Sequence, residues 1–329
     1  MFDYLNLIIS FGISIILFFA VRNYFSTIKL FDINDLKISK SKGVVTSTGI
    51  VFLIVFLIQS LFNFYDIKSS LPNRYYIFFG SVIFLSLLSF YDDVKNIDPK
   101  IRLILQLIIV YFSLTSLPLT FFPVPLKLLM FISLVIWVYI INVTNFVDGL
   151  DGFCATTIIS YFIGVVLICK ILNLEIFSYI IALYVMPILL AFLIFNKPKA
   201  SIFMGDAGSI FLGYLVGFTF LEICLNNKFN LAISIFLYPL MDCTITIIKK
   251  IINGHLPWAR LSDYFFLMPV KSGKKSHSFV LIIYIFYLIF NLLLLYFQIV
   301  YSELIFFMIN LIITFCLIIY FNSFKKYLK

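Results

Sequence analysis

Residues 128–147 read LLMFISLVIWVYIINVTNFV and carry no charged side chain. A helix needs about 20 apolar residues to cross the hydrocarbon core of a bilayer, and it satisfies its own backbone hydrogen bonds where no water is present. The stretch therefore predicts a transmembrane helix. Its end is polar, since Asn142 and Asn145 interrupt the apolar run and DGLDG follows at 148–152.

Similar apolar stretches recur along the chain of 329 residues, which is 63% hydrophobic and only 12% charged. Soluble domains carry about 45–50% apolar and about 25% charged residues, so the composition excludes a pair of soluble domains. We predict an all-α integral membrane protein with about 11 transmembrane helices in a single polytopic domain, residues 1–329. The predicted spans lie at about 5–21, 44–64, 75–91, 103–120, 128–147, 152–169, 176–195, 207–221, 231–248, 278–298 and 304–322.

Lys and Arg indicate the orientation, because they collect on the cytoplasmic side of membrane proteins. The connections after odd-numbered spans, together with the C-terminal tail, hold 19 of the 24 basic residues. We therefore expect the N-terminus outside and the C-terminus in the cytoplasm. The net charge of +9 is explained by this asymmetry and by attraction to the lipid bilayer, so no nucleic acid is expected as a partner.

Three acidic motifs fall in connections expected on the cytoplasmic face. Residues 90–93 (FYDD) end the third span, 142–152 (NVTNFVDGLDG) join the fifth and sixth, and 203–209 (FMGDAGS) precede the eighth. The polar side chains of 142–152 recur every three residues on one helical face, which is costly against lipid and favours a polar cavity. Each motif alone also fits a simpler structure, namely a solvated helix end, a helix-capping turn or a Gly-Asp turn.

The longest inner connection, 249–277, is basic, and basic side chains bind either anionic lipid or phosphate. Asp242 is the only charged residue inside a predicted span, where it costs roughly 2.5–3.5 kcal/mol unless paired or hydrated, so we expect it to have a partner or a function. Carboxylates at three inner helix ends, with cations nearby, suit a divalent metal and basic side chains that hold phosphates for phosphoryl transfer. The expected active-site loops are 92–102, 145–152, 196–209 and 249–277.

At these motifs the sequence resembles the polyprenyl-phosphate N-acetylhexosamine-1-phosphate transferases of bacterial glycosyltransferase family 4. The resemblance implies transfer of a sugar 1-phosphate from a UDP-N-acetylhexosamine to undecaprenyl phosphate, with release of UMP, in the bacterial inner membrane with the active site facing the cytoplasm. It also implies Mg²⁺, with Mn²⁺ as the alternative, and by family analogy alone a homodimer. It rests on YDD at 91–93, PK at 99–100 with Gln106, 142–152, 203–209, PLMD at 239–242 and SH at 276–277.

The resemblance assigns roles residue by residue. Asp92, Asp93 and Asp206 would be catalytic, and Asp206, Asp93 and Asp148 would bind the metal. Asp92 would organise the lipid phosphate rather than deprotonate it, because a phosphate monoester is already largely ionised near neutral pH. The residues expected to bind substrate are Lys100, Asn142, Asn145, Asp148, Asp151, Phe203, Arg260 and His277, with Phe203 stacking on uracil.

Two segments depart from the family pattern. Residues 45–49 read VTSTG where the family usually has a Pro-Arg-Gly-Gly-Gly-like stretch, and 257–264 read PWARLSDY where histidines are usual. The missing histidines disfavour the peptidoglycan branch and favour an O-antigen or capsule-initiating enzyme of lipopolysaccharide or cell wall biogenesis that uses GlcNAc or a 6-deoxy-HexNAc. An inactive homologue is a further alternative.

Two other classes of protein are alternatives. A polytopic transporter or lipid flippase would place polar groups at mid-membrane in several spans, whereas here they gather at inner helix ends. A CDP-alcohol phosphotransferase would also use Asp-Gly turns with a metal, but its longer signature is missing.

Overall fold

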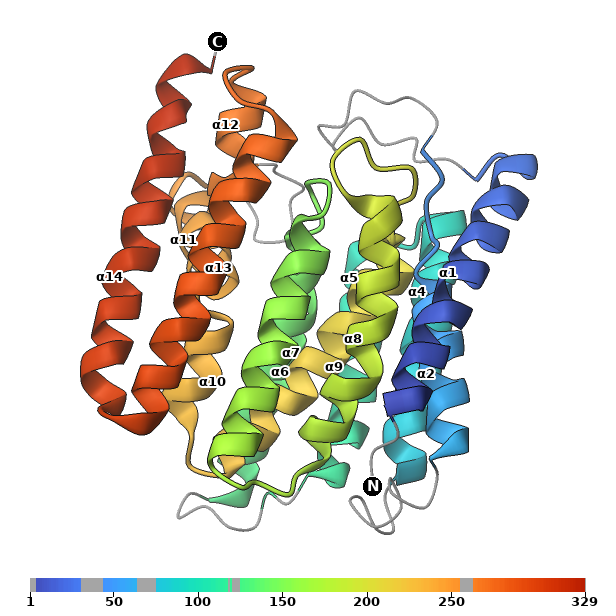
Figure 1. Cartoon of the computed structure of the whole chain (residues 1–329), viewed down its shortest axis with the longest axis horizontal. Helices are drawn as coiled ribbons and strands as arrows, with labels where there is room; N and C mark the ends of the chain where they lie inside the picture. The colour runs from blue at the N-terminus through green and yellow to red at the C-terminus, as the bar shows by residue number, and fades with distance from the viewer. Residues whose placement is uncertain are drawn as a thin grey trace.

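The computed structural model describes residues 4–30, 44–63, 75–117, 119, 125–254 and 263–328, which form a bundle of helices (Figure 1). In this part of the chain the only pairing of extended backbone is a bridge between Val45 and Ile202, so the all-α class is confirmed. The helices are α1 (Tyr4–Thr27), α2 (Ile50–Phe62), α4 (Tyr75–Lys95), α5 (Pro99–Ser113), α6 (Leu126–Phe146), α7 (Phe153–Ile171), α8 (Phe177–Asn196), α9 (Gly205–Leu225), α10 (Phe229–Ile235), α11 (Leu237–Ile252), α12 (Met268–Lys271), α13 (His277–Val300) and α14 (Glu303–Asn322), with short 3-10 turns η1 (Leu114–Ser116), η3 (Phe265–Leu267) and η4 (Ser323–Tyr327).

Nine of the described helices are long and apolar enough to cross a membrane, and a tenth span results if α10 and α11 are counted together. The integral membrane class is confirmed, although this criterion does not reach the predicted number of eleven spans. The predicted span at 231–248 is wrong in detail, because α10 and α11 meet at an angle of 80°. Pro239 explains the break, since it has no N–H to donate to the carbonyl of Ile235 and its ring clashes with that carbonyl in a continuous helix.

The predicted span at 44–64 is also wrong in detail, because α2 begins only at Ile50. Residues 44–49, here called the support segment, run beside the connection between α8 and α9. The Phe203 N–H donates to the Val45 carbonyl at 2.8 Å, and the Gly49 N–H donates to the Met204 carbonyl at 2.9 Å. The apolar Val44 and Val45 therefore belong to a packed extended segment rather than to a longer helix.

Helix α9 is the most buried of the spans, because small residues along it allow its neighbours to approach closely. A Cβ atom on Gly213 would lie 2.8 Å from the Cα of Ile141 in α6, and one on Gly217 would collide with the ring of Trp137. The indole N–H of Trp137 also donates to the Tyr214 carbonyl at 2.9 Å, which fixes the register of α6 against α9.

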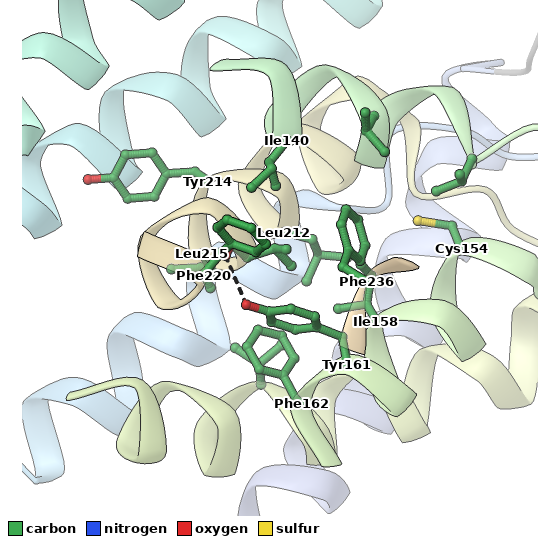
Figure 2. Packing of buried hydrophobic residues seen from close by; sticks show 14 of the residues in the cluster. Ile140, Cys154, Ile158, Tyr161, Phe162, Leu212, Tyr214, Leu215, Phe220 and Phe236 are labelled. Atoms are coloured by element: carbon green, nitrogen blue, oxygen red, sulfur yellow. Dashed lines mark hydrogen bonds between the residues drawn. The ribbon is translucent and has the colours of Figure 1, made fainter. Parts of the chain in front are cut away.

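Figure 2 shows how α7 packs against the same central helix, with Ile158 and Tyr161 beside Leu212 and Leu215. All four side chains are fully buried. The Tyr161 hydroxyl donates to the Val216 carbonyl at 3.1 Å, so even the polar atom of this ring is satisfied inside the core. This packing holds α9, and with it the start of α9, in one position.

The connection between α6 and α7 and the connection between α8 and α9 lie at the same end of the bundle as the C-terminus, and the N-terminus lies at the opposite end (Figure 1). We call the former the site end. The acidic motifs at 142–152 and 203–209 are on these two connections and the helix ends beside them, so the fold brings them to one end although about 60 residues separate them.

Candidate functional site

Asp206, in the first turn of α9, is at the centre of a group of polar side chains from four helices. Its Oδ1 accepts from the side-chain amide of Asn145 in α6 at 3.0 Å, and its Oδ2 contacts the guanidinium of Arg102 in α5. Its backbone N–H donates to Asp93 Oδ1 in α4 at 2.8 Å. Together with Asp92, which also binds Arg102, these residues are called the Asp206 cluster.

Asp93 caps the N-terminus of α9 from a different helix. Its Oδ1 and Oδ2 accept from the backbone N–H groups of Asp206 and Ala207, at 2.8 and 3.2 Å. A carboxylate is favourable there because the first N–H groups of a helix have no partner within it and the helix dipole is positive at that end. Asp93 therefore sets the position of Asp206.

Gly205 makes this cap possible. Its φ is +69°, in the left-handed region that favours glycine. A Cβ atom here would lie 2.5 Å from Asp93 Oδ2 and 2.9 Å from the Cα of Ser47 in the support segment. Both the backbone conformation and the lack of space for a Cβ atom therefore require glycine at 205. This explains the presence of Gly205 in the 203–209 motif.

Asp92 and Asp206 share one cation. The Arg102 Nη1 atom lies 2.8 Å from Asp92 Oδ2 and also contacts Asp206 Oδ2. Asp92 is 6% exposed, and its Oδ1 accepts from the Ile97 N–H at 2.6 Å. Two neighbouring carboxylates repel each other, and the guanidinium between them offsets this repulsion.

Arg102 was not among the predicted site residues, although a signal for it exists in the sequence. Asp98 caps the start of α5 by accepting from the Lys100 N–H at 2.7 Å, with Pro99 in the first turn. From that start, Arg102 and Gln106 are four residues apart and share a helical face. The side-chain oxygen of Gln106 accepts from the side-chain amide of the predicted site residue Asn142 at 2.9 Å. The face of α5 that carries Gln106 and Arg102 therefore points toward α6.

A second group, here called the Asp151 junction, consists of Asp151, the backbone of Lys199 and Ala200, and His277. It joins three connections near the start of α7. Asp151 is buried, and its Oδ2 accepts from the backbone N–H groups of Lys199 and Ala200 at 3.2 and 3.4 Å. The Nδ1 of His277, at the start of α13, lies 3.3 Å from the same oxygen. Asp151 and His277 are both predicted to bind substrate. The structure brings them into contact with each other, and their contacts here organise the backbone of the α8–α9 connection.

The other residues predicted to bind substrate or metal differ in how exposed they are. Lys100 is exposed, and Asp148 is half-buried at the end of α6. Phe203 is 5% exposed and packs with Val44 and Ala200, so the predicted stacking on a base would require its ring to be uncovered. Arg260 lies outside the described residues.

Asp242, the buried acid of a predicted span, has partners in the structure. Its carboxylate accepts from the backbone N–H groups of Phe265 and Phe266 at 3.0 and 3.2 Å, and from the Tyr238 hydroxyl at 3.0 Å. These hydrogen bonds offset the cost of burying the anion. Asp242 therefore anchors η3, which carries Phe265 and Phe266, to α11.

The donor set of the Asp206 cluster fits a divalent cation that takes few protein ligands. The described residues contain no group of three or more His, Cys, Asp or Glu side chains arranged to hold a metal by themselves. Mg²⁺, however, is commonly held by one or two carboxylates with water and substrate phosphates. The Asp206 side chain is 30% exposed and already faces a cation, Arg102. Both oxygens of Asp93 face backbone N–H groups, so metal binding by Asp93 and by Asp148 stays a prediction.

Comparison with known proteins gives a match between residues 75–224 and the model of glycosyl transferase family 4, in agreement with the resemblance carried by the motifs. The matched residues include the whole Asp206 cluster and Asp151 of the junction.

Individual relatives are similar over part of the chain. A probable undecaprenyl-phosphate N-acetylglucosaminyl 1-phosphate transferase of Bacillus subtilis (strain 168) is 28% identical over 215 residues, 61% of this chain and 60% of that protein. Phospho-N-acetylmuramoyl-pentapeptide-transferases of Leuconostoc citreum and Staphylococcus saprophyticus are 33% and 30% identical, over 45% and 58% of this chain and 48% and 65% of those proteins. The similarity thus spans less than two thirds of the length of each relative.

Proposed function

We propose that this chain, whose residues 75–224 match the model of glycosyl transferase family 4, transfers an N-acetylhexosamine 1-phosphate from a UDP-N-acetylhexosamine to undecaprenyl phosphate and releases UMP. The Asp206 cluster is the single observation that carries the proposal. It brings three carboxylates, an arginine and an amide from four helices to one end of the bundle. The name of the Bacillus subtilis relative supports the lipid acceptor.

In this reaction an oxygen of the lipid phosphate attacks the phosphorus that carries the sugar. The bond between that phosphorus and the oxygen bridging to the nucleotide breaks, and the bridging oxygen leaves as part of UMP. No proton is required from the attacking phosphate, which is largely ionised near neutral pH. The main difficulty is to bring two anions together, so charge stabilisation and positioning dominate the catalysis.

Each residue of the cluster has a role in this scheme. Asp206 would hold the divalent cation, and Mg²⁺ would supply positive charge to the donor diphosphate. Arg102 is positioned to bind a phosphate oxygen, as guanidinium groups do well. Asp92 orients Arg102 through their 2.8 Å contact, and Asp93 holds the first turn of α9 in place. Asn145 fixes the rotamer of Asp206.

The donor and the pathway are part of the proposal. We favour GlcNAc or a 6-deoxy-HexNAc as the sugar, with the product starting an O-antigen or capsule polysaccharide, because histidines usual in the family are absent from 257–264. The site end of the bundle would face the cytoplasm of a bacterial inner membrane, where UDP-sugars are present. The excess of Lys and Arg in the connections of that end supports this orientation.

The test is turnover by the purified chain with undecaprenyl phosphate, Mg²⁺ and a panel of UDP-N-acetylhexosamines. We expect UMP and a lipid-linked sugar diphosphate from the wild type, and loss of both products in Asp206→Asn and Asp92→Asn. Glu175→Gln, an exposed acid in the connection between α7 and α8 and outside the cluster, is the matched control and keeps its activity. Full turnover in both cluster variants would remove the assignment, and release of UDP instead of UMP would show that the reaction type is wrong.

A further inference from the structure

Ser47, in the support segment, has a backbone conformation that serine rarely adopts. Its φ is +61°, in the left-handed region, and the residue is fully buried. A side chain in this region is crowded by its own backbone, so the conformation persists only where the surrounding structure enforces it. Strained residues of this kind gather at functional sites, which makes Ser47 a candidate for a role in the reaction.

The other described residues with a positive φ, apart from glycines, have a simpler explanation. All five are exposed, and they are Lys29, Asn96, Asn173, Lys199 and Asn227. Four of them directly follow the ends of α1, α4, α7 and α9, where a left-handed residue commonly ends a helix. Ser47 differs from them because it is buried and precedes a helix.

Hydrogen bonds fix the backbone on both sides of Ser47. The Thr46 N–H donates to the Leu30 carbonyl at 3.2 Å. The N–H and the hydroxyl of Thr48 both donate to the Phe203 carbonyl, at 3.2 and 3.0 Å. The neighbours therefore impose the positive φ of Ser47 and tie this part of the support segment to the connection that leads into α9.

The side chain of Ser47 faces Asp93. A Cβ atom on Gly205 would lie 2.5 Å from Asp93 Oδ2 and 2.9 Å from the Cα of Ser47, so the carboxylate and the serine are neighbours. The Ser47 hydroxyl interacts with this carboxylate, although it makes no hydrogen bond of standard geometry to any described residue. The carboxylate has room for a further donor, since it offers about four lone-pair sites and its bonds to the N–H groups of Asp206 and Ala207 leave some of them open.

We propose that Ser47 is a positioning residue that acts through Asp93 on the first turn of α9. The inference rests on the proposed function, in which Asp206 in that turn takes part in the transfer. Asp93 joins α4 to α9, and Ser47 links both to the support segment, so the carboxylate is held from a third direction. Without the hydroxyl, Asp93 and the start of α9 can shift together, and Asp206 shifts with them. Turnover falls as a result, because the reaction depends on positioning.

The experiment measures UMP release and the unfolding temperature in Ser47→Ala and Ser47→Gly. We expect Ser47→Ala to lower kcat by about 10-fold, the effect of about one hydrogen bond to a charged group. The KM for the UDP-sugar should change little, because the fully buried hydroxyl cannot touch the substrate. Ser47→Gly should lower kcat as much but unfold at a higher temperature than Ser47→Ala, since glycine adopts the positive φ without strain.

Ser86→Ala is the matched control. It removes a fully buried serine hydroxyl in α4 that donates to the Val82 carbonyl at 2.7 Å and lies outside the Asp206 cluster. This variant should keep the wild-type kcat. Equal kcat values for Ser47→Ala and Ser86→Ala would overturn the proposal, because the loss of a buried hydroxyl at 47 would then have no specific effect on turnover.

A double-mutant cycle in unfolding temperature tests the contact without relying on turnover. Ser47→Ala should lower the unfolding temperature of the wild type more than that of Asp93→Ala, which lacks the acceptor. Equal shifts in the two backgrounds would also overturn the proposal. A wild type that releases no UMP would instead refute the proposed function, and the cycle would still decide whether Ser47 holds Asp93.

Discussion

Gly205 offers a sharp test of how the Asp206 cluster is assembled. In Gly205→Ala the new Cβ would lie 2.5 Å from Asp93 Oδ2 and 2.9 Å from the Cα and N of Ser47. Both neighbours are held, Asp93 by its hydrogen bonds to α9 and Ser47 by the packed support segment. The substitution must therefore displace the Asp93 carboxylate, the start of α9, or both.

The size of the effect follows from the contacts. The left-handed φ of +69° costs an alanine about 1–2 kcal/mol. Each hydrogen bond between a charged and a neutral group is worth about 1.5–3 kcal/mol, and two such bonds join Asp93 to α9. We expect a loss in stability of about 2.5–5 kcal/mol if one bond is lost and about 4–8 kcal/mol if both are lost. We also expect a loss of about 100-fold in turnover, which is typical of a misplacement near 1 Å.

Gly273→Ala is the matched control. Gly273 has a similar φ of +66°, but no atom lies within 4 Å of its added Cβ. This variant should lose only about 1–2 kcal/mol of stability, the cost of the left-handed φ for an alanine, and should keep its turnover. The assay is the unfolding temperature in detergent together with UMP release. Equal losses of turnover in the two variants would refute the reasoning, because the cost would then come from backbone conformation and not from the cap.

Two further substitutions test other parts of the account. Arg102→Gln should reduce UMP release by about 100-fold or more, because it leaves Asp92 and Asp206 without their shared cation. Lys100→Gln, on the exposed surface, should have a smaller effect, and equal effects of the two substitutions in a turnover assay would contradict the role given to Arg102. Asp242→Asn should lower the unfolding temperature by the equivalent of about 2–4 kcal/mol, because an amide nitrogen would replace one carboxylate oxygen and face the backbone N–H group that this oxygen now accepts from. An unchanged unfolding temperature would show that this carboxylate is not an anchor.

Much of the fold follows from the sequence because the membrane imposes a simple rule. Apolar runs of about 20 residues must be helices, and the ends of those runs carry the polar motifs. The convergence of Asp92, Asp93, Asn145 and Asp206 also follows, because they lie at helix ends expected on one side of the membrane.

Features that depend on tertiary contacts could not be predicted in the same way. The support segment is as apolar at Val44 and Val45 as a helix would be, and only its pairing with 202–204 makes it extended. The break between α10 and α11 has a local signal in Pro239, but proline also occurs inside the continuous helix α8, at Pro187. Arg102 is one of several basic residues near the third span, and only the register of α5 against α6 distinguishes it from Lys100.

The most direct test of the central claim follows one phosphorus atom. The purified chain would be incubated with undecaprenyl phosphate and UDP-GlcNAc labelled with ³²P at the phosphate attached to the sugar, and parallel reactions would use the 6-deoxy-HexNAc donors. We predict that the label moves to the lipid fraction with unlabelled UMP in solution, and that Asp206→Asn prevents this movement. Label that remains in the nucleotide, released as UDP, while the sugar enters the lipid fraction would contradict the account.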